Sequence, residues 1–213
     1  MFKKIRNLRI KTSQKAVRKV TFEIDRVVDG WHHDPHSVLG PHSDEQSTTI
    51  RVLRPWAKSV DVVLGSLTFK MTHEARGVWT VTINKPSVRN YSLLVDYGTG
   101  ADEFHDAYSF LPTINEFDLN LFSAGRHEDL WNVLGAHPRT SDGVAGVSFT
   151  VWAPNAQGVR VVGDFNHWDG TAHPMRSMGS SGVWELFIPG VGVGATYRFS
   201  ILGRDGNWRS KSD

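Results

Sequence analysis

The sequence predicts an all-β chain of two tandem β-sandwiches, with one short helix before the first. Two observations carry this prediction: the chain repeats itself once along its length, and both copies contain short runs of alternating apolar and polar residues. Such alternation is typical of half-buried antiparallel strands. The 213 residues allow one large domain or two domains of ordinary size.

The internal repeat consists of five matches that keep the same order. The segment His36–His42 is echoed by Trp131–His137, and Ile50–Ala57 is echoed by Phe149–Ala156. Three shorter matches follow: Gly77–Trp79 with Gly182–Trp184, Tyr91 with Tyr197, and Asp106 with Asp213. The offset between partners grows slowly along the chain, as expected for a duplicated domain with loop insertions.

The strands of both copies follow from the alternation. In the second copy, Tyr197, Phe199 and Ile201 are predicted to face the core, so Arg198 must face outward. The other apolar positions that alternate with their neighbours are Trp79, Val81, Ile83, Tyr91, Leu93, Val95, Val147, Phe149, Val151, Trp184, Leu186 and Ile188. Glu185 and Phe187 fall on the opposite, solvent-facing side of their strand. With about 85–90 residues per copy, the pattern favours an immunoglobulin-like β-sandwich for each.

The boundaries follow from composition. A basic arm is predicted at residues 1–20, the first sandwich at 21–110, a connector at 111–126 and the second sandwich at 127–213. The predicted helix opens the first unit, where Phe22, Ile24, Val27 and Val28 form an apolar stripe that ends at Gly30.

The two copies are predicted to end differently. After Asp106 the first copy continues through residues 107–114, where a last strand is expected. The second copy has no such continuation, so we expect it to be truncated at its C-terminal end, with an exposed sheet edge that favours aggregation.

Composition excludes several classes of protein. The sequence has no cysteine, which excludes disulfides and thiolate metal sites and fits a cytoplasmic location. No apolar run reaches the roughly 20 residues that span a bilayer, so no membrane partner is expected. The basic arm carries eight Lys and Arg residues and no acid. It favours only nonspecific contacts with nucleic acid or anionic lipid, and no specific nucleic-acid partner.

A histidine-rich segment is the alternative candidate site. His32, His33, His36 and His42 lie near Asp34, but Pro35 interrupts the run and no helical metal-ligand spacing is present. We therefore expect no metal and no cofactor. No arrangement of nucleophile, base and acid stands out either, so no catalytic residue is predicted in this chain.

The loop Gly163–Gly170 is the strongest candidate for ligand binding. It holds Trp168 between small polar residues, and flat aromatic rings stack on the apolar faces of sugars. Outward-facing Arg198, and Trp208 after the turn at residues 204–207, are predicted to join Trp168 in recognising α-glucan, with Asn166 and Asp169 as further polar contacts. The alternative is that Trp168 folds back onto the sandwich edge. Phe165, in the same loop, is expected to belong to the core.

The first copy lacks this set of residues. At the repeat offset, Phe69 stands where Trp168 stands, and Ser92 stands where Arg198 stands. A scaffold that keeps its core and loses these residues in one copy indicates that the set serves binding rather than folding.

Several segments carry a family resemblance. In the second copy they are Leu134–His137, Val151–Ala156, Val162–Gly170, His173–Arg176, Gly182–Gly190 and Lys211–Asp213. Residues 146–213 resemble the family-48 carbohydrate-binding module that precedes the catalytic domain of 1,4-α-glucan (glycogen) branching enzymes. The segment His33–His42 resembles the extra amino-terminal module of bacterial branching enzymes. In the related glycogen-binding module of the AMP-activated kinase β-subunit, the ligand site matches Trp168, Arg198 (a lysine there) and Trp208.

The resemblance implies a role in glycogen biosynthesis. Branching enzymes transfer glucan in a (β/α)₈ barrel, which needs about 250 residues, so this chain is expected to hold only non-catalytic modules. Its expected partners are α-1,4-glucan (glycogen and maltooligosaccharides) and the catalytic barrel of the parent enzyme. Two alternatives stay open: a stand-alone glycogen- or starch-binding module, and the amino-terminal part of a related debranching enzyme.

Overall fold

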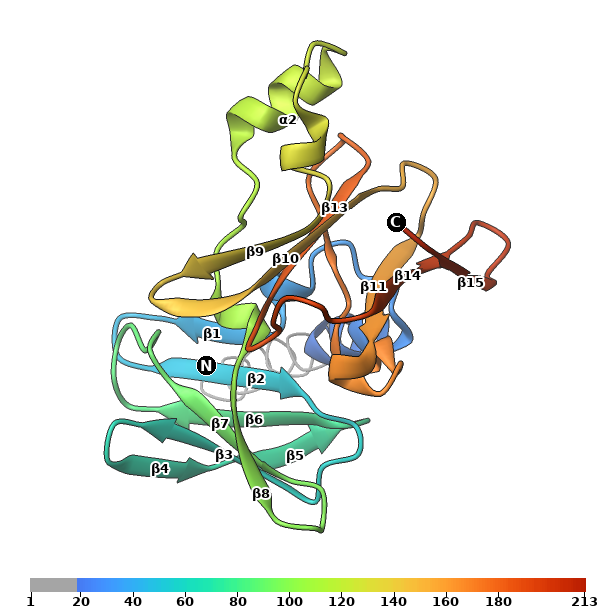
Figure 1. Ribbon diagram of the computed structural model, residues 1–213. Helices are drawn as coiled ribbons and strands as arrows, with labels where there is room; N and C mark the ends of the chain where they lie inside the picture. The colour runs from blue at the N-terminus through green and yellow to red at the C-terminus, as the bar shows by residue number, and fades with distance from the viewer. Residues whose placement is uncertain (1–18) are drawn as a thin grey trace, which may run out of the picture.

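A computed structural model describes residues 19–213, which form two β-sandwiches packed against each other. The predicted basic arm at residues 1–20 lies almost entirely outside the described residues. Figure 1 shows the strands of the first sandwich in cyan to green and those of the second in yellow to red. The predicted all-β fold, with a short helix before the first sandwich, is confirmed.

In the first sandwich, two four-stranded antiparallel sheets enclose an apolar core. One sheet has the order β1 (Gly40–Ser43), β2 (Thr48–Leu53), β6 (Val78–Ile83) and β5 (Thr72–Ala75). The other has the order β4 (Leu67–Lys70), β3 (Ser59–Leu64), β7 (Ser92–Asp96) and β8 (Ala101–His105). Their facing apolar positions, including Val52, Val62 and Leu93, are fully buried.

The second sandwich pairs a four-stranded sheet with a three-stranded one. The first of these has the order β12 (Arg176–Ser177), β13 (Val183–Pro189), β10 (Val144–Trp152) and β9 (Gly135–Ser141). The second has the order β11 (Gly158–Gly163), β14 (Tyr197–Leu202) and β15 (Trp208–Lys211). The short helical turns are η1 (Pro35–Ser37), η2 (Ala107–Ser109), η3 (Leu130–Asn132), η4 (Asp164–Asn166) and η5 (Gly170–Ala172).

The two sandwiches share one topology, as the sequence repeat predicts. The order β9-β10-β13-β12 matches β1-β2-β6-β5, and β11-β14-β15 matches β3-β7-β8. The difference lies at one edge. In the first sandwich β4 pairs with β3, whereas in the second the chain leaves β11 and forms η4 and η5. The loop Gly163–Gly170 therefore takes the place of an edge strand.

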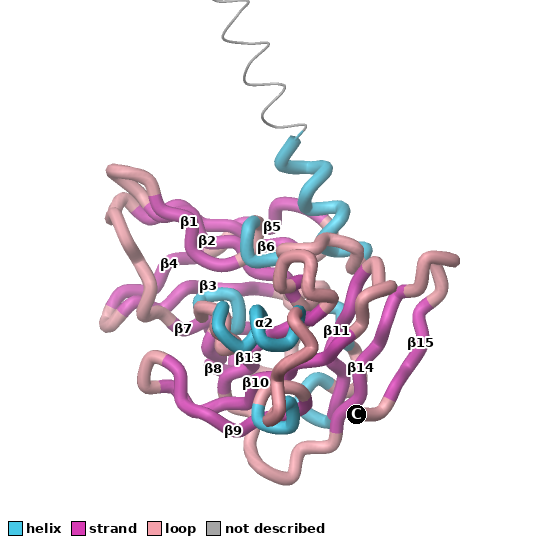
Figure 2. Tube along the Cα trace, turned by 90° about the horizontal axis from the view of Figure 1, so that it is seen from above, coloured by secondary structure: helices cyan, strands magenta, loops and turns pink. Residues whose placement is uncertain are grey.

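The N-terminal helix joins the two sandwiches. Residues 19–29 are helical, and Ile24 and Val27 are buried in a core cluster that includes residues of both sandwiches. On its polar side, Asp29 accepts a hydrogen bond of 2.6 Å from Arg76 in the turn between β5 and β6. Figure 2 shows this helix in cyan at the top of the molecule. The apolar stripe predicted from sequence thus holds the two modules together.

The central strand β13 is buried on both faces, which corrects one expectation. The alternation predicted that Glu185 and Phe187 face solvent, but both are fully buried. The reason is that the chain after η2 crosses this face of the sheet. The Phe110 ring packs on Phe187 with centroids 4.9 Å apart, and the Thr113 hydroxyl donates to Glu185 at 2.8 Å.

The segment at residues 107–114 is also not the last strand that was expected. It forms η2 and then an irregular segment, with Tyr108 and Ile114 buried. The Tyr108 hydroxyl donates to the Pro174 carbonyl at 3.0 Å, so this segment contacts the second sandwich instead of extending a sheet of the first. The chain then forms α2 (Glu116–Ser123), the yellow-green helix at the top of Figure 1. Across residues 19–213, no helix has the length and apolar character needed to cross a membrane.

Candidate functional site

The loop Gly163–Gly170 holds Trp168 in an unusual backbone conformation. After η4, His167 and Trp168 both have left-handed backbones, with φ of 53° and 62°. Large side chains rarely adopt this region, which costs on the order of 1–3 kcal/mol and is concentrated at functional sites. The Trp168 side chain is 48% exposed, whereas Phe165 packs on Phe149 with centroids 5.5 Å apart. The expectation that Phe165 joins the core is confirmed, and Trp168 does not fold back into it.

Asn166 fixes the shape of this loop. Its side-chain oxygen accepts from the Gly163 N–H at 2.8 Å. Its amide nitrogen lies 3.0 Å from the Val161 carbonyl and 3.0 Å from His173 Nδ1. Because both amide hydrogens are used within the loop, only the side-chain oxygen retains capacity to bind another group.

The Asn166 contact requires an unprotonated His173, which predicts a pH dependence. Burial, with a smaller effect of the Arg54 guanidinium, lowers the pKa of His173 to about 3. The unfolded chain therefore binds a proton between about pH 6.5 and pH 3 that the folded chain does not bind. The free energy of unfolding should fall on acidification through this window, by at most about 1.4 kcal/mol per pH unit for one group.

Urea denaturation of wild type and His173→Asn between pH 7 and pH 4.5 measures this effect. The variant keeps an acceptor near the Nδ1 position but cannot titrate, so its loss of stability on acidification should be smaller than that of wild type. His105→Asn, which replaces an exposed histidine, should retain the wild-type dependence. An equal pH dependence in wild type and His173→Asn contradicts this account.

Arg198 lies on the outer face of β14, as the alternation predicted. Tyr197, Phe199 and Ile201 pack on the core, whereas Arg198 is exposed. Within residues 19–213 the structure gives its guanidinium no hydrogen bond or ion pair. Arg198 pairs across the sheet with Val162 of β11. Gly170 lies against the Val162 side chain, so the loop returns over the same end of this face.

Trp208 lies at the other end of that face. It pairs with Leu202, four positions along β14 from Arg198, which corresponds to about 13 Å. The Arg160 guanidinium lies 4.5 Å from the Trp208 ring centroid and donates to the Val28 carbonyl at 2.9 Å. One face of the Trp208 ring therefore packs at the contact with the N-terminal helix, and Arg160, which covers that face, also lies against Gly170 at the end of the loop.

Asp169 connects the loop to the first sandwich. Its Oδ1 accepts from the Thr171 N–H at 2.9 Å and from the Thr171 hydroxyl, and its Oδ2 accepts from the Trp56 indole N–H at 3.1 Å. Burial alone would raise the pKa of Asp169. The hydrogen bonds from Thr171 and Trp56, with the charge of Arg160, outweigh this effect and lower the pKa of the carboxyl below its usual value.

Trp56 was not among the residues expected at the site. It lies in the turn between β2 and β3 and is 74% exposed. The sequence repeat could have identified Trp56 as a surface residue. It aligns with Asn155 of the second copy, a polar residue outside the alternating strands. A tryptophan at a turn position has no packing role that the strand pattern explains, so it should have been considered as a surface contact.

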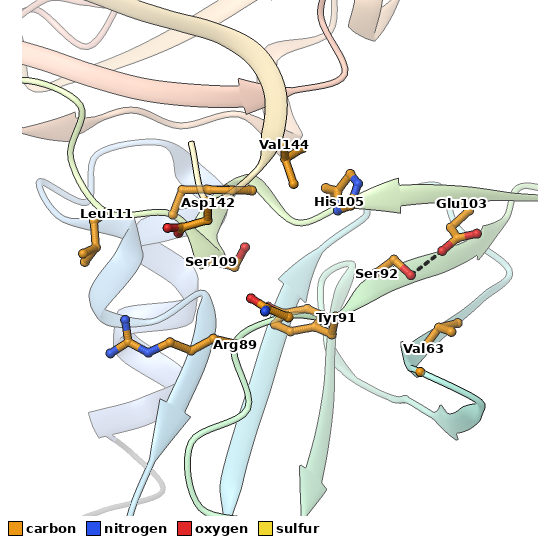
Figure 3. Close-up of a pocket in the computed structure, with 13 residues that line it drawn as sticks. Val63, Arg89, Tyr91, Ser92, Glu103, His105, Ser109, Leu111, Asp142 and Val144 are labelled. Carbon is orange, nitrogen blue, oxygen red and sulfur yellow. Dashed lines mark hydrogen bonds between the residues drawn. The ribbon is translucent and has the colours of Figure 1, made fainter. Parts of the chain in front are cut away.

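A cavity of about 710 Å³ lies between the two sandwiches, away from the predicted residues. Figure 3 shows Ser92 and His105 on the first sandwich, with Asp142 and Val144 of the β9–β10 hairpin above them. The Ser92 hydroxyl donates to Glu103. Ser92 is the repeat partner of Arg198. The face of the first sandwich that corresponds to the Arg198 face of the second is therefore partly covered by the β9–β10 hairpin.

The histidine-rich segment has ordinary structural contacts. His32 Nε2 lies 3.0 Å from Glu23 Oε2, and His42 Nε2 donates to the Leu39 carbonyl at 3.1 Å. In residues 19–213 no three histidine, aspartate or glutamate side chains gather in a way that could hold a metal ion.

Comparison with protein families matches both sandwiches. The model described as alpha-1,4-glucan branching enzyme GlgB, N-terminal domain, matches residues 21–108. The model described as Carbohydrate-binding module 48 (Isoamylase N-terminal domain) matches residues 133–213.

Curated relatives match nearly the whole chain. The 1,4-alpha-glucan branching enzyme GlgB 2 of Streptomyces coelicolor is 52% identical over 189 residues, which cover 88% of this chain and 26% of the relative. The GlgB of Rhodococcus jostii is 48% identical over 203 residues, which cover 93% of this chain and 28% of the relative. The chain thus spans about a quarter of the length of these relatives.

Proposed function

The chain belongs to the α-1,4-glucan branching enzyme family, of which it represents the amino-terminal modules, and we propose that these modules bind α-1,4-glucan and position it for glucosyl transfer by the parent enzyme. The match lies outside the catalytic region of the relatives, so no catalytic residue is assigned in residues 1–213. The proposal includes a cytoplasmic location, which fits a sequence without cysteine.

The exposed Trp168 is the observation that carries this proposal. Its loop stands where the first sandwich has an edge strand, and it holds the exposed Trp168 in a left-handed backbone conformation. The ring would stack on the apolar face of a glucose unit. Arg198 has no partner among residues 19–213 and would donate to sugar hydroxyls from the same end of the sheet.

The other predicted site residues have smaller roles in the proposal. Asp169 and Asn166 would offer the acceptor capacity that their loop hydrogen bonds leave unused. Trp208 would contact glucan only through the ring face that Arg160 does not cover.

Calorimetric titration of the chain with maltoheptaose tests the function. A module of this kind should bind with a dissociation constant on the order of 0.1–10 mM, which is about 3–5 kcal/mol. Arg198→Ala should weaken binding about two- to tenfold, because one hydrogen bond to a charged donor is lost. Arg204→Ala removes an exposed arginine from the neighbouring turn and should leave the affinity unchanged. No detectable binding by wild type would reject the glucan proposal.

We assign the contact with the catalytic barrel of the parent enzyme to the surface around α2. Three large aromatic side chains are exposed there: Phe117 at 68%, Trp131 at 67% and Trp152 at 55%. The Phe122 ring of α2 packs on Trp152 with centroids 6.0 Å apart, so the helix and β10 present one continuous aromatic surface. Exposed apolar surface of this kind is typical of an interaction site.

A further inference from the structure

Trp56 of the first sandwich is exposed without contributing to the core. It follows Pro55 in the turn after β2, and 74% of its surface is accessible. Its indole N–H donates to Asp169 Oδ2, 113 residues further along the chain and in the other sandwich. Trp56 belongs to neither core cluster of the described residues, and this hydrogen bond is the side-chain interaction that the structure gives it.

This hydrogen bond places two exposed tryptophans at one carboxylate. Asp169 directly follows Trp168, which is 48% exposed. Trp56 and Trp168 therefore both neighbour Asp169, Trp56 through its hydrogen bond and Trp168 along the chain, one from each sandwich. The Asp169 carboxylate retains lone pairs that can accept from a hydroxyl group.

The relative positions of the two tryptophans are fixed by packing. Close to Asp169, the Tyr108 hydroxyl of the first module donates to the Pro174 carbonyl of the second at 3.0 Å. At the first residue of β11, an added Cβ at Gly158 would lie 1.8 Å from the Gly30 carbonyl oxygen, so the two modules also touch through their backbones. These contacts hold the two sandwiches together, and the hydrogen bond to Asp169 orients the Trp56 indole, which lowers the entropy cost of binding a ligand there.

We propose that Trp56 is a second stacking platform for α-1,4-glucan, so that the glucan site spans both sandwiches. The proposal rests on the glucan-binding function proposed above. A glucan chain presents one apolar face per glucose unit, and a chain of several units would stack on Trp168 with one unit and on Trp56 with another. Asp169 would accept from a sugar hydroxyl between them. A single glucose unit would reach only one of the two rings.

The competing account is that Trp56 only tethers the two sandwiches through its N–H group. The two accounts differ for a phenylalanine at this position, because phenylalanine keeps an apolar ring and lacks the donor. They differ also in chain-length dependence, since a tether should affect short and long ligands alike.

Calorimetric titration of the 213-residue chain with maltotriose and maltoheptaose separates them. Trp56→Ala should weaken maltoheptaose binding at least about fivefold, as expected for one stacked ring, and weaken maltotriose binding less. Trp56→Phe should retain most of the maltoheptaose affinity. Phe104→Ala removes another exposed aromatic ring, on β8, and should behave as wild type.

Each other outcome rejects a specific claim. If Trp56→Ala binds both ligands as wild type does while Trp168→Ala binds neither, Trp56 is no platform and the glucan function stands. If Trp56→Phe loses as much affinity as Trp56→Ala, the contribution of Trp56 to affinity comes from its N–H hydrogen bond to Asp169, and stacking is rejected. If wild type binds neither ligand, both the glucan function and the spanning site are rejected.

Discussion

Replacing Trp168 by alanine should weaken maltoheptaose binding by about tenfold or more, because an aromatic stack contributes on the order of 1–3 kcal/mol and each 1.4 kcal/mol is a factor of ten. The effect should exceed that of Arg198→Ala, since a solvent-exposed hydrogen bond contributes less than a stacked ring. Isothermal titration calorimetry measures both variants under one set of conditions.

The folded state should tolerate this substitution. The ring is half exposed, and the hydrogen bond from the Trp168 N–H to the Gly163 carbonyl, 2.8 Å long, involves only backbone atoms. Trp168→Gly should even raise the urea midpoint slightly, because glycine adopts the left-handed conformation without steric cost. A variant that binds glucan as wild type does, or that unfolds when the ring is removed, contradicts the assignment of Trp168 as a binding residue.

The sequence could predict Arg198 because its strand has one buried and one open face. Along β14, alternation alone determines which side chains meet the core, and the structure places Tyr197, Phe199 and Ile201 there. The same rule was wrong for Glu185 and Phe187 of β13. Alternation predicts which face of a strand packs on the core of its own sandwich. It contains no information about another segment of the chain, here the one with Phe110 and Thr113, that covers the opposite face.

The candidate site shows a similar division. Trp168 stands out in the sequence because its loop is local, and the first copy of the repeat provides a comparison within the chain. Trp56 depends on a contact between the two sandwiches. The covered face of Trp208 depends on Arg160, which is held by its hydrogen bond to the Val28 carbonyl of the N-terminal helix. Such contacts join residues more than a hundred positions apart, and no pattern of spacing within one strand or loop indicates them.

Glu185→Ala should lower the free energy of unfolding by about 3–5 kcal/mol, because it leaves a buried arginine without its partner. Glu185 is fully buried, and its Oε2 accepts from Arg176 Nε at 2.8 Å. Its Oε1 accepts from the Thr113 hydroxyl at 2.8 Å and from the Thr113 N–H at 3.1 Å. Arg176 is 7% exposed, so water cannot replace the lost carboxylate.

Two further variants identify the cause of this loss. The double variant Arg176→Met with Glu185→Leu removes both charges and should recover most of the stability, since apolar replacement of a buried ion pair is often close to neutral. Asp205→Ala breaks the Asp205–Arg209 ion pair, whose side chains are about half exposed, and should barely move the urea midpoint. A double variant as unstable as Glu185→Ala would show that shape, rather than unpaired charge, dominates at this position.

The position of Thr113 makes this experiment informative about the whole chain. Thr113 belongs to the segment between the two sandwiches and binds Glu185 through both its backbone and its side chain. If the modules unfold as one unit, Glu185→Ala should lower the midpoint of a single transition. If the contacts at Thr113 and Tyr108 are weaker than the two cores, the second sandwich should unfold first and leave a separate transition for the first.

Trp56 and Asp169 meet across that same boundary between the sandwiches. A glucan that stacks on both Trp56 and Trp168 should therefore restore the single transition in Glu185→Ala.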